Sequence, residues 1–300
     1  IENRLSELWN LFDFLMPGYL YTNHAFREKL EKPILKSKDP GAESHLRRLV
    51  QPFILRRLKK DVLKELPPKE EYVRKISLSE EERKLYYACV QAAVADLGDG
   101  QGKLQILAAL TRLRQVCCDP GLCFENYDGP ASKLDACVEL CEAMVENGHQ
   151  ILLFSQFTSM LDRLRARLDA LHISSFTLQG STSKEKRASM VKAFNAGEAS
   201  VFLISLKAGG TGLNLTAADI VIHFDPWWNQ AAQDQATDRA HRIGQQAHVQ
   251  VYKLIAKDTI EEKILELQEK KAALLDTISG CEETRILNMS SEELLSLLKS

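Results

Sequence analysis

Hydrophobic residues follow two different rhythms along this chain. Up to about residue 125 they recur at spacings of three and four, which is typical of amphipathic helices. This pattern predicts helices at 2–15, 22–31, 42–50 and 104–118. One segment, 70–78, alternates between apolar and polar residues and predicts a strand. Ser79 and Glu82 then predict a capping box for another long helix.

From about residue 131 the pattern becomes an alternation of helices and strands. It predicts strands at 150–155, 175–178, 200–205, 219–224 and 249–255. It predicts helices at 157–171, 183–195, 229–242 and 258–278. Three of the strands are continuous apolar runs, which is expected for strands buried on both faces. The sequence therefore predicts an α/β fold with an open, mainly parallel sheet flanked by helices.

Composition narrows the class of protein. The chain has 300 residues, 45% of them hydrophobic, which is enough for two domains or for one large and one small domain. Its formal net charge is -2, so a nucleic-acid contact would need a local basic patch. No apolar run approaches the roughly 20 residues of a membrane helix, so no membrane partner is expected. Because the chain begins with Ile1 and not with Met, we interpret it as cut inside a larger protein.

The cysteines indicate a reducing environment. There are seven, an odd number spread through helical segments, which favours reduced thiols in an intracellular protein. Cys117, Cys118 and Cys123 are a conceivable metal-ligand set, but no Cys-x-x-Cys pair and no nearby histidine supports them. We therefore expect buried apolar thiols and no metal site in this chain.

A glycine-rich segment, SLKAGGTGLNL at 205–215, directly follows a predicted buried strand. Its glycines allow a tight turn and a close approach of the backbone to a ligand. It is not a P-loop, because the pattern G-x-x-x-x-G-K-[ST] is absent from the whole sequence. The spacing alone leaves open a ligand-binding loop and a plain strand-to-helix turn.

Two arginines stand three residues apart in DQATDRAHRIGQ, at 234–245. On the predicted helix, Arg239 and Arg242 would share one face, with Gln235 one turn earlier. One interpretation is a solvated face or an ion pair with Asp234 or Asp238. The other is a pair of arginine fingers, because a planar guanidinium suits phosphate oxygens and stabilises charge on a transferred phosphoryl group.

Two tryptophans follow the fourth predicted strand of the second half, in DPWWNQ at 225–230. Adjacent tryptophans on a loop cannot easily both enter the core, so one is expected to pack there. The other is available to a nucleic-acid backbone or another domain. Asn229 is expected to cap the next helix.

A basic run lies between residues 46 and 64 and is interrupted by one acid, Asp61. Its members are Arg47, Arg48, Arg56, Arg57, Lys59, Lys60 and Lys64. A solvated helix face and a phosphate-binding edge both fit this run, and the second would make DNA affinity fall steeply with salt.

Taken together, these motifs resemble a known family. SLKAGGTGLNLTAADIVIHFDPWWN followed by QATDRAHRIGQ is similar to the second ATPase lobe of the Swi/Snf-type DNA translocases, a branch of helicase superfamily two. QILLFSQFTSMLD is similar to that family's motif IV, and PFILRRLKKDVLKELPPK to the segment linking its lobes. The resemblance covers nearly the whole chain. Gln179 and Gln230 depart from it, since the family more often has Asp and Pro there.

The resemblance implies a RecA-like fold and an ATP site in the cleft between two lobes. The first lobe would supply the P-loop lysine and the Asp-Glu pair that holds Mg²⁺, and neither a Walker A motif nor an Asp-Glu dipeptide occurs in this chain. The implied ATP-binding residues are Gly210, Gly212, Gln235, Arg239 and Arg242, the two arginines being catalytic. We therefore expect this chain alone to hydrolyse no ATP.

The resemblance also implies contacts with the backbone of double-stranded DNA. The residues on the corresponding motifs are Ser155, Gln156, Ser205, Lys207 and Trp227, to which the basic run adds Arg56 and Arg57. The other expected partners are the first ATPase lobe of the same protein and nucleoprotein substrates. The remaining alternatives are a non-catalytic scaffold with the same fold and an RNA helicase lobe.

The predicted organisation has four parts. Residues 1–20 end the first lobe or its linker, 21–125 form a helical protrusion and inter-lobe segment, 126–278 form the RecA-like domain, and 279–300 form a helical tail. The short C-terminal tail favours a bacterial source. The expected location is then the cytoplasm or nucleoid, and it is the nucleus if the source is eukaryotic.

Overall fold

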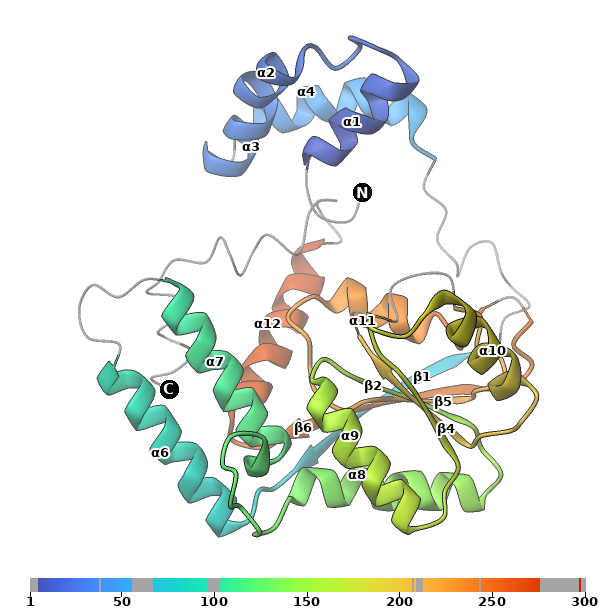
Figure 1. Ribbon diagram of the computed structural model, residues 1–300. Coiled ribbons are helices and arrows are strands. Elements are labelled where there is room, and N and C mark those ends of the chain that lie inside the picture. The colour runs from blue at the N-terminus through green and yellow to red at the C-terminus, as the bar shows by residue number, and fades with distance from the viewer. Residues whose placement is uncertain are drawn as a thin grey trace. The chain divides into compact units, whose positions relative to one another are not determined.

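Six parallel strands form the sheet around which most of the chain is arranged (Figure 1). The structure, a computed structural model, describes residues 5–37, 39–55, 67–96, 103–206, 208, 213–242, 244–275 and 297. The main segments of its two compact units are Ile1–Lys64 and Glu65–Asp276, and the sheet belongs to the second, larger unit. Within the described residues, no helix is both long and apolar enough to cross a membrane.

The strands lie in the order β1-β6-β5-β2-β4-β3. Their bounds are β1 Lys69–Ile76, β2 Ile151–Ser155, β3 Ser175–Leu178, β4 Val201–Ser205, β5 Ile220–His223 and β6 Val249–Ala256. Every pairing is parallel; Ile151 of β2, for example, stands opposite Val201 of β4 and Ile220 of β5. The predicted fold class is confirmed, and the sheet is more uniform than expected because all of its pairs are parallel.

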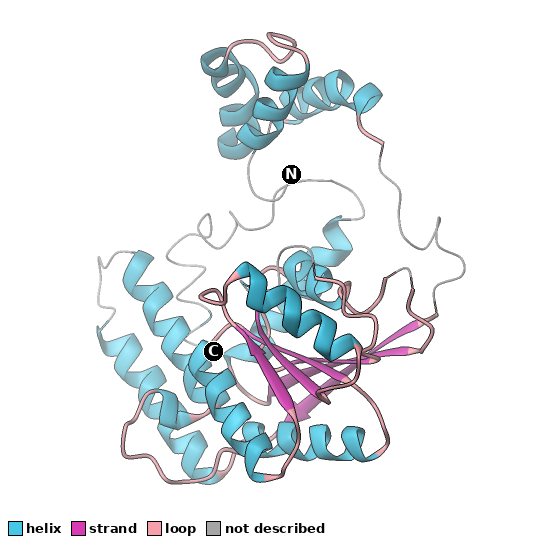
Figure 2. Cartoon of the chain, turned by 45° about the vertical axis from the view of Figure 1, so that its right-hand side comes forward, coloured by secondary structure: helices cyan, strands magenta, loops and turns pink. Residues whose placement is uncertain are grey.

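The central strands have helices on both faces, which explains their continuous apolar sequences. One face contributes Leu153 to a core with Leu164 and its neighbours on α9 (Thr158–Ala170) and with α8 (Ser132–Glu146). The other face contributes Leu152 and Phe154 to a core with α10 (Lys184–Asn195) and α11 (Gln230–Thr237). Figure 2 shows the sheet between these two helical layers. Successive residues of a strand point to opposite faces, so an all-apolar strand supplies both cores.

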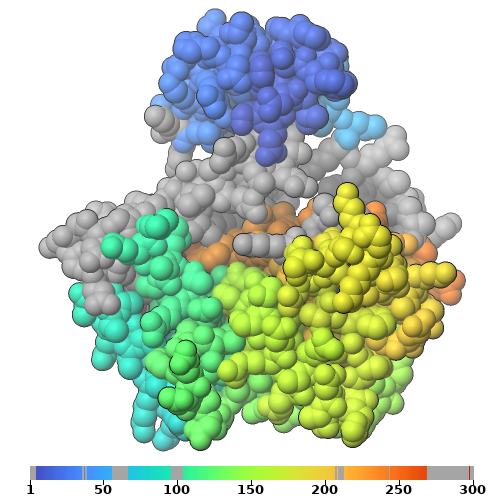
Figure 3. Space-filling view, in the orientation of Figure 1, coloured from blue at the N-terminus to red at the C-terminus, as the bar shows by residue number. Residues whose placement is uncertain are grey.

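Three further helices pack beside the sheet: α6 (Glu80–Asp96), α7 (Lys103–Cys118) and α12 (Ile260–Leu275). The predicted capping box is confirmed, since the Ser79 N–H donates to Glu82 Oε2 (2.7 Å) and the Glu82 N–H donates to Ser79 Oγ (3.2 Å). The same buried carboxylate also accepts the Ser132 N–H (2.9 Å) at the start of α8, a contact that local patterning does not reveal. Figure 3 shows α7, α9 and α10 on the viewer's side of this unit.

Residues 65–125 group differently from the predicted division. They belong to the larger unit because β1 pairs with β6 along its whole length, from Lys69 opposite Val249 to Ile76 opposite Ala256. Helices α6 and α7 pack on each other, and α7 also packs on α8 and α12.

The smaller unit is helical, as predicted. It contains α1 (Leu5–Leu15), α2 (Asn23–Phe26), a π-helical turn Arg27–Glu31, α3 (Lys32–Ser37), α4 (Pro40–Val50) and a 3₁₀ turn Gln51–Phe53. Leu8, Phe12, Phe26, Leu30 and Leu46 form its core. Most of the basic run, including Arg56 and Arg57, lies outside the described residues, as does the predicted tail helix apart from Leu297.

Candidate functional site

The described site candidates lie at two opposite edges of the sheet. Ser155 and Ser205 end β2 and β4, and Trp227 follows β5, so these residues lie at the carboxyl edge. Arg239 and Arg242 lie between α11 and β6, and their turn bonds to residues that precede β5 and β1 at the amino edge. The structure thus places the described candidates in two groups.

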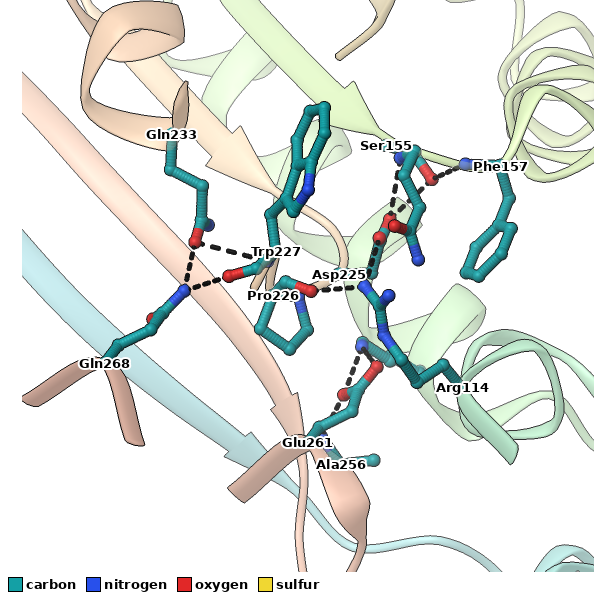
Figure 4. Close-up of polar contacts among 12 residues, drawn as sticks. Arg114, Ser155, Phe157, Asp225, Pro226, Trp227, Gln233, Ala256, Glu261 and Gln268 are labelled. Atoms are coloured by element: carbon teal, nitrogen blue, oxygen red, sulfur yellow. Dashed lines mark hydrogen bonds and ion pairs between the residues drawn. The ribbon is translucent and has the colours of Figure 1, made fainter. Parts of the chain in front are cut away.

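At the carboxyl edge, Asp225 joins two loops (Figure 4). Its Oδ1 accepts hydrogen bonds from Ser155 Oγ (2.5 Å) and from the Gln156 N–H (3.2 Å), and its Oδ2 lies 3.3 Å from Arg114 Nη2. The carboxylate is fully buried. Burial raises the pKa of Asp225, while the Arg114 charge and the Ser155 hydrogen bond oppose that increase. The network fixes the loop after β2 against the turn after β5.

Arg114 reaches this network from α7. One of its guanidinium nitrogens, Nη2, also donates to the Pro226 carbonyl, and the guanidinium lies 5.6 Å from the ring centroids of both Phe157 and Trp228. Only 2% of Arg114 is exposed. The sequence did not reveal this residue, because it is one of two arginines on α7 and its partner is 111 residues away.

The turn that carries Trp227 and Trp228 is also held by side chains of α11 and α12. The Trp227 N–H donates to Gln233 Oε1 (3.2 Å), which also accepts a bond from Gln268 Nε2 (2.7 Å), and Gln268 Nε2 donates to the Trp227 carbonyl. Trp227 and Trp228 are both half-buried, and Trp227 packs on the core, in agreement with the sequence. The predicted cap is confirmed, since the Ala232 N–H donates to Asn229 Oδ1 (3.3 Å).

The predicted DNA-contacting serines face inward in this structure. Ser155 Oγ is bound to Asp225, and Ser205 Oγ accepts the Ala208 N–H (3.3 Å). DNA contacts at these positions remain a prediction. Gln156 is half-buried, and its Nε2 has no hydrogen-bond partner within the described part of the chain. Lys207, Gly210 and Gly212 lie outside the described residues.

Residues 238–242, here called the arginine turn, differ from the predicted secondary structure. The helix expected over 229–242 ends at Thr237, so Arg239 and Arg242 are not on a helix. The chain tightens there, because the Arg239 N–H bonds to the Ala236 carbonyl (3.1 Å) and the Arg239 carbonyl accepts the Leu215 N–H (3.1 Å). The Arg239 carbonyl, which could have continued the helix, therefore binds Leu215 at the end of the glycine-rich segment.

The two arginines differ in exposure. Arg239 is 7% exposed, and burial, together with the nearby Arg242 charge, lowers its pKa. Arg242 is exposed, and its Nη1 donates to the Leu213 carbonyl (3.2 Å). Two neighbouring guanidinium groups attract an anion with several oxygens. Gln235 is exposed on α11, so it does not share a face with buried Arg239 as the sequence predicted.

The arginine turn and the glycine segment are both anchored. Gln245 Nε2 donates to the carbonyls of Ala218 (2.8 Å) and Ala240 (3.2 Å). Arg187 of α10 donates to the Ala208 carbonyl (3.0 Å), and Asn195 Nδ2 at the end of the same helix donates to the Asn214 carbonyl (2.8 Å). Ala208 and Asn214 of the glycine-rich segment are thus both bonded to α10. None of these anchors was predicted.

A buried histidine lies beneath α11. His223 is 1% exposed, stacks on Phe154 and shares a hydrogen bond between its Nε2 and Thr237 Oγ1 (2.9 Å). Burial, reinforced by the Lys253 charge and only partly opposed by Glu71, lowers the pKa of His223 from 6.5 to about 3. The imidazole is therefore neutral at pH 7 and supports the last turn of α11 just before the arginines.

We expect acid to destabilise the larger unit through this histidine. Between pH 6.5 and about 3 the unfolded chain binds a proton at His223 that the folded chain does not. Stability is therefore complete above pH 6.5 and falls with pH in that window, by about 1.4 kcal/mol per pH unit. Urea unfolding at pH 7.5 and pH 5.0 measures the loss, which His223→Asn should reduce. His172→Asn, at an exposed position with φ of 57°, is the control. Equal acid sensitivity of wild type and His223→Asn would contradict the assignment.

The described cysteines are reduced, and Cys117, Cys118, Cys137 and Cys141 are buried. Burial raises the pKa of Cys118, which keeps this thiol protonated. Within the ranges that the structure describes, no group of three or more His, Cys, Asp and Glu side chains could hold a metal ion.

Comparison with known proteins gives two family matches. The SNF2-related domain family matches residues 1–122, and the helicase conserved C-terminal domain family matches residues 132–244. Among curated proteins, a putative ATP-dependent helicase/translocase of Bacillus subtilis is 40% identical over 310 residues, covering 99% of this chain and 34% of its own length. The chain spans between 18% and 34% of the length of curated relatives such as these.

Solved structures from Sulfolobus solfataricus are similar in both sequence and fold. The SWI2/SNF2 ATPase C-terminal domain is 30% identical with a TM-score of 0.63, covering 77% of this chain and 98% of its own. The SWI2/SNF2 ATPase core in complex with double-stranded DNA is 32% identical with a TM-score of 0.64, covering 99% of this chain and 64% of its own.

Proposed function

Because this chain belongs to the SWI2/SNF2 family of ATP-dependent helicases, we propose that it is the second ATPase lobe of a translocase acting on double-stranded DNA. The observation that carries this proposal is the arginine turn at the amino edge. It holds two guanidinium groups beside the end of the glycine segment, one of them exposed. A family match to a helicase C-terminal domain ends at residue 244, just after these arginines.

In this proposal Arg239 and Arg242 stabilise negative charge on the γ-phosphate of ATP. Such groups act through electrostatic preorganisation, which is strongest when the donors are already fixed before the reaction. Gln245 and the Leu215 N–H provide that fixation through backbone carbonyls of the turn. Gly210, Gly212 and Gln235 are proposed to approach the nucleotide. The remaining nucleotide contacts would come from the first lobe.

Mg²⁺ would be held by groups outside this chain. The side chains described at the arginine turn are mainly nitrogen donors, whereas Mg²⁺ prefers carboxylate, phosphate and water oxygens. When bound, the ion would neutralise charge on the phosphates. This chain's own residues supply the arginines and the backbone that orients them.

We propose that DNA lies along the carboxyl edge. Gln156 and Trp227 sit on loops tied together by Asp225, and the solved relative in complex with double-stranded DNA supports a backbone contact by this family. Ser155, Ser205 and Lys207 belong to the same proposed surface. Arg56 and Arg57 are proposed to contact DNA as well. Phosphate contacts of this kind position a protein without reading sequence.

Coupling between ATP and DNA is proposed to run through the connection between β4 and β5. Strand β4 ends at the carboxyl edge and β5 begins at the amino edge, and α10 bonds to Ala208 and Asn214 between them. A displacement of the arginine turn on lobe closure would therefore be transmitted towards the DNA loops. Repeated closure and opening would move the lobes along the duplex.

The test compares this chain alone with a protein in which it is joined to its first ATPase lobe. We expect no ATP hydrolysis by the chain alone and hydrolysis by the joined protein that duplex DNA stimulates. A joined protein without ATPase activity would favour the scaffold alternative. Stimulation by RNA and not by duplex DNA would favour an RNA helicase lobe. Robust DNA-stimulated hydrolysis by the chain alone would also contradict the proposal.

A further inference from the structure

We infer that Arg114 is a positioning residue for DNA binding, because it holds the two DNA-facing loops of the carboxyl edge in one arrangement. The inference rests on the proposed function, since that proposal places DNA contacts on Gln156 and Trp227. Arg114 itself is 2% exposed and cannot reach a duplex. It would act only through the loops that it joins.

The groups around Arg114 are suited to a buried guanidinium, because they include an anion, a carbonyl and aromatic rings. Its Nη2 bonds to the Asp225 carboxylate (3.3 Å) and to the Pro226 carbonyl, and aromatic rings of Phe157 and Trp228 lie over it. Removing a cation from water is costly, and here an ion pair, a carbonyl and two ring faces offset that cost. Every one of these partners belongs to a DNA-facing loop and none to α7 itself.

The partners come from two separate segments. Phe157 lies in the loop after β2, next to Gln156, while Asp225, Pro226 and Trp228 belong to the turn after β5 (Figure 4). Asp225 reinforces the same link because it also accepts the Gln156 N–H (3.2 Å). The two proposed contacts flank this buried ion pair. Their spacing is therefore set by Arg114 and Asp225 and not by either loop alone.

Lysine cannot reproduce this arrangement. Its ammonium group could bond to Asp225 and to the Pro226 carbonyl, but it lacks the planar face that stacks on aromatic rings. Arg114→Lys therefore keeps the charge while releasing Phe157 or Trp228. This makes it a mild substitution that separates positioning from charge.

Arg163 offers a matched control. It also bridges a carboxylate and a carbonyl, with Nη1 bonding to Asp119 Oδ2 (2.8 Å) and Nη2 to the Gly121 carbonyl (2.8 Å). Its partners lie in the turn after α7, away from the proposed DNA loops. Arg163→Lys therefore makes the same substitution at a more exposed guanidinium.

Tryptophan fluorescence measures the environment of the turn after β5 directly. The sequence contains three tryptophans, and Trp9→Phe leaves Trp227 and Trp228, both in this turn. In that background Arg114→Lys should increase quenching by acrylamide and shift the emission to longer wavelength, because Trp228 loses its stacked partner. Arg163→Lys should change neither. Identical spectra for wild type and Arg114→Lys would overturn the inference.

The functional experiment uses the protein with both lobes. We expect Arg114→Lys to raise the duplex concentration needed for half-maximal ATPase stimulation by about tenfold, with the DNA-independent rate and the KM for ATP unchanged. Arg163→Lys should stay at the wild-type concentration. Trp228→Leu, which keeps the ion pair but removes one ring, should give a smaller change in the same direction.

The outcomes separate the inference from the proposed function. If the wild-type protein shows no stimulation by duplex DNA, the proposed function fails. If the wild type is stimulated but Arg114→Lys and Arg163→Lys need equal DNA concentrations, only the role of Arg114 fails. A parallel loss of the DNA-independent rate in Arg114→Lys would indicate general structural damage and would also overturn the inference.

Discussion

Replacing Arg242 with alanine is expected to abolish measurable ATP turnover in the protein that carries both lobes. An arginine that stabilises charge on a transferred phosphoryl group contributes about 10³–10⁵ in rate. Arg242 is the exposed member of the pair, and its described hydrogen bond is to the Leu213 carbonyl. The fold should therefore remain intact while kcat falls. Steady-state ATP hydrolysis with saturating duplex DNA measures the effect.

The control is Arg165→Ala, which removes an exposed arginine of α9 that pairs with Asp169 one helical turn away. It should leave turnover and stability near wild type, since exposed pairs contribute little. Arg239→Ala is a less clean test, because Arg239 is buried and its loss should lower stability as well as activity. Wild-type turnover in Arg242→Ala would remove the proposed role of the arginine turn.

Lys133→Met is expected to cause the largest loss of stability. Lys133 of α8 and Glu261 of α12 are both fully buried, with Nζ lying 2.7 Å and 2.5 Å from the two carboxylate oxygens. Burial lowers the pKa of Lys133, but the charge and hydrogen bond of Glu261, together with other nearby groups, outweigh it and the net shift is upward. Removing the lysine leaves a buried carboxylate without its cation, which costs about 3–5 kcal/mol. Urea or thermal unfolding of the chain measures the loss.

Lys75→Met is the matched control, because Lys75 pairs with the adjacent Glu262 (2.7 Å) but is 56% exposed. It should leave the free energy of unfolding close to the wild-type value, because exposed pairs contribute little. Adding Glu261→Gln to Lys133→Met should recover part of the loss, since an amide keeps an acceptor for the Ala256 N–H without a charge. Similar losses for Lys133→Met and Lys75→Met would show that burial of the pair contributes nothing.

The strands were predictable because their sequences carry the physical cause of their burial. Residues 151–154 and 201–204 are apolar at every position, and only a two-sided environment satisfies them. The capping box at Ser79 was predictable for a similar reason, since both of its members lie within one helical turn. Local chemistry of this kind is visible in the sequence before any fold is known.

The site was less predictable because its determinants are distant in sequence. The ion pair between Arg114 and Asp225 joins residues 111 positions apart, and the end of α11 depends on a bond from Leu215 to the Arg239 carbonyl. Helical spacing placed both arginines on one helix face, but a tertiary contact ended the helix first. The motif identified the chemical groups, whereas their exposure and orientation required the fold.

The hydrogen bonds of Glu82 couple the starts of two helices in the larger unit. One carboxylate caps α6 through Ser79 and accepts the Ser132 N–H at the beginning of α8. If either helix detaches, the other loses an acceptor for its first turn, so neither start is complete by itself. Segments 50 residues apart therefore gain their order in a single cooperative step.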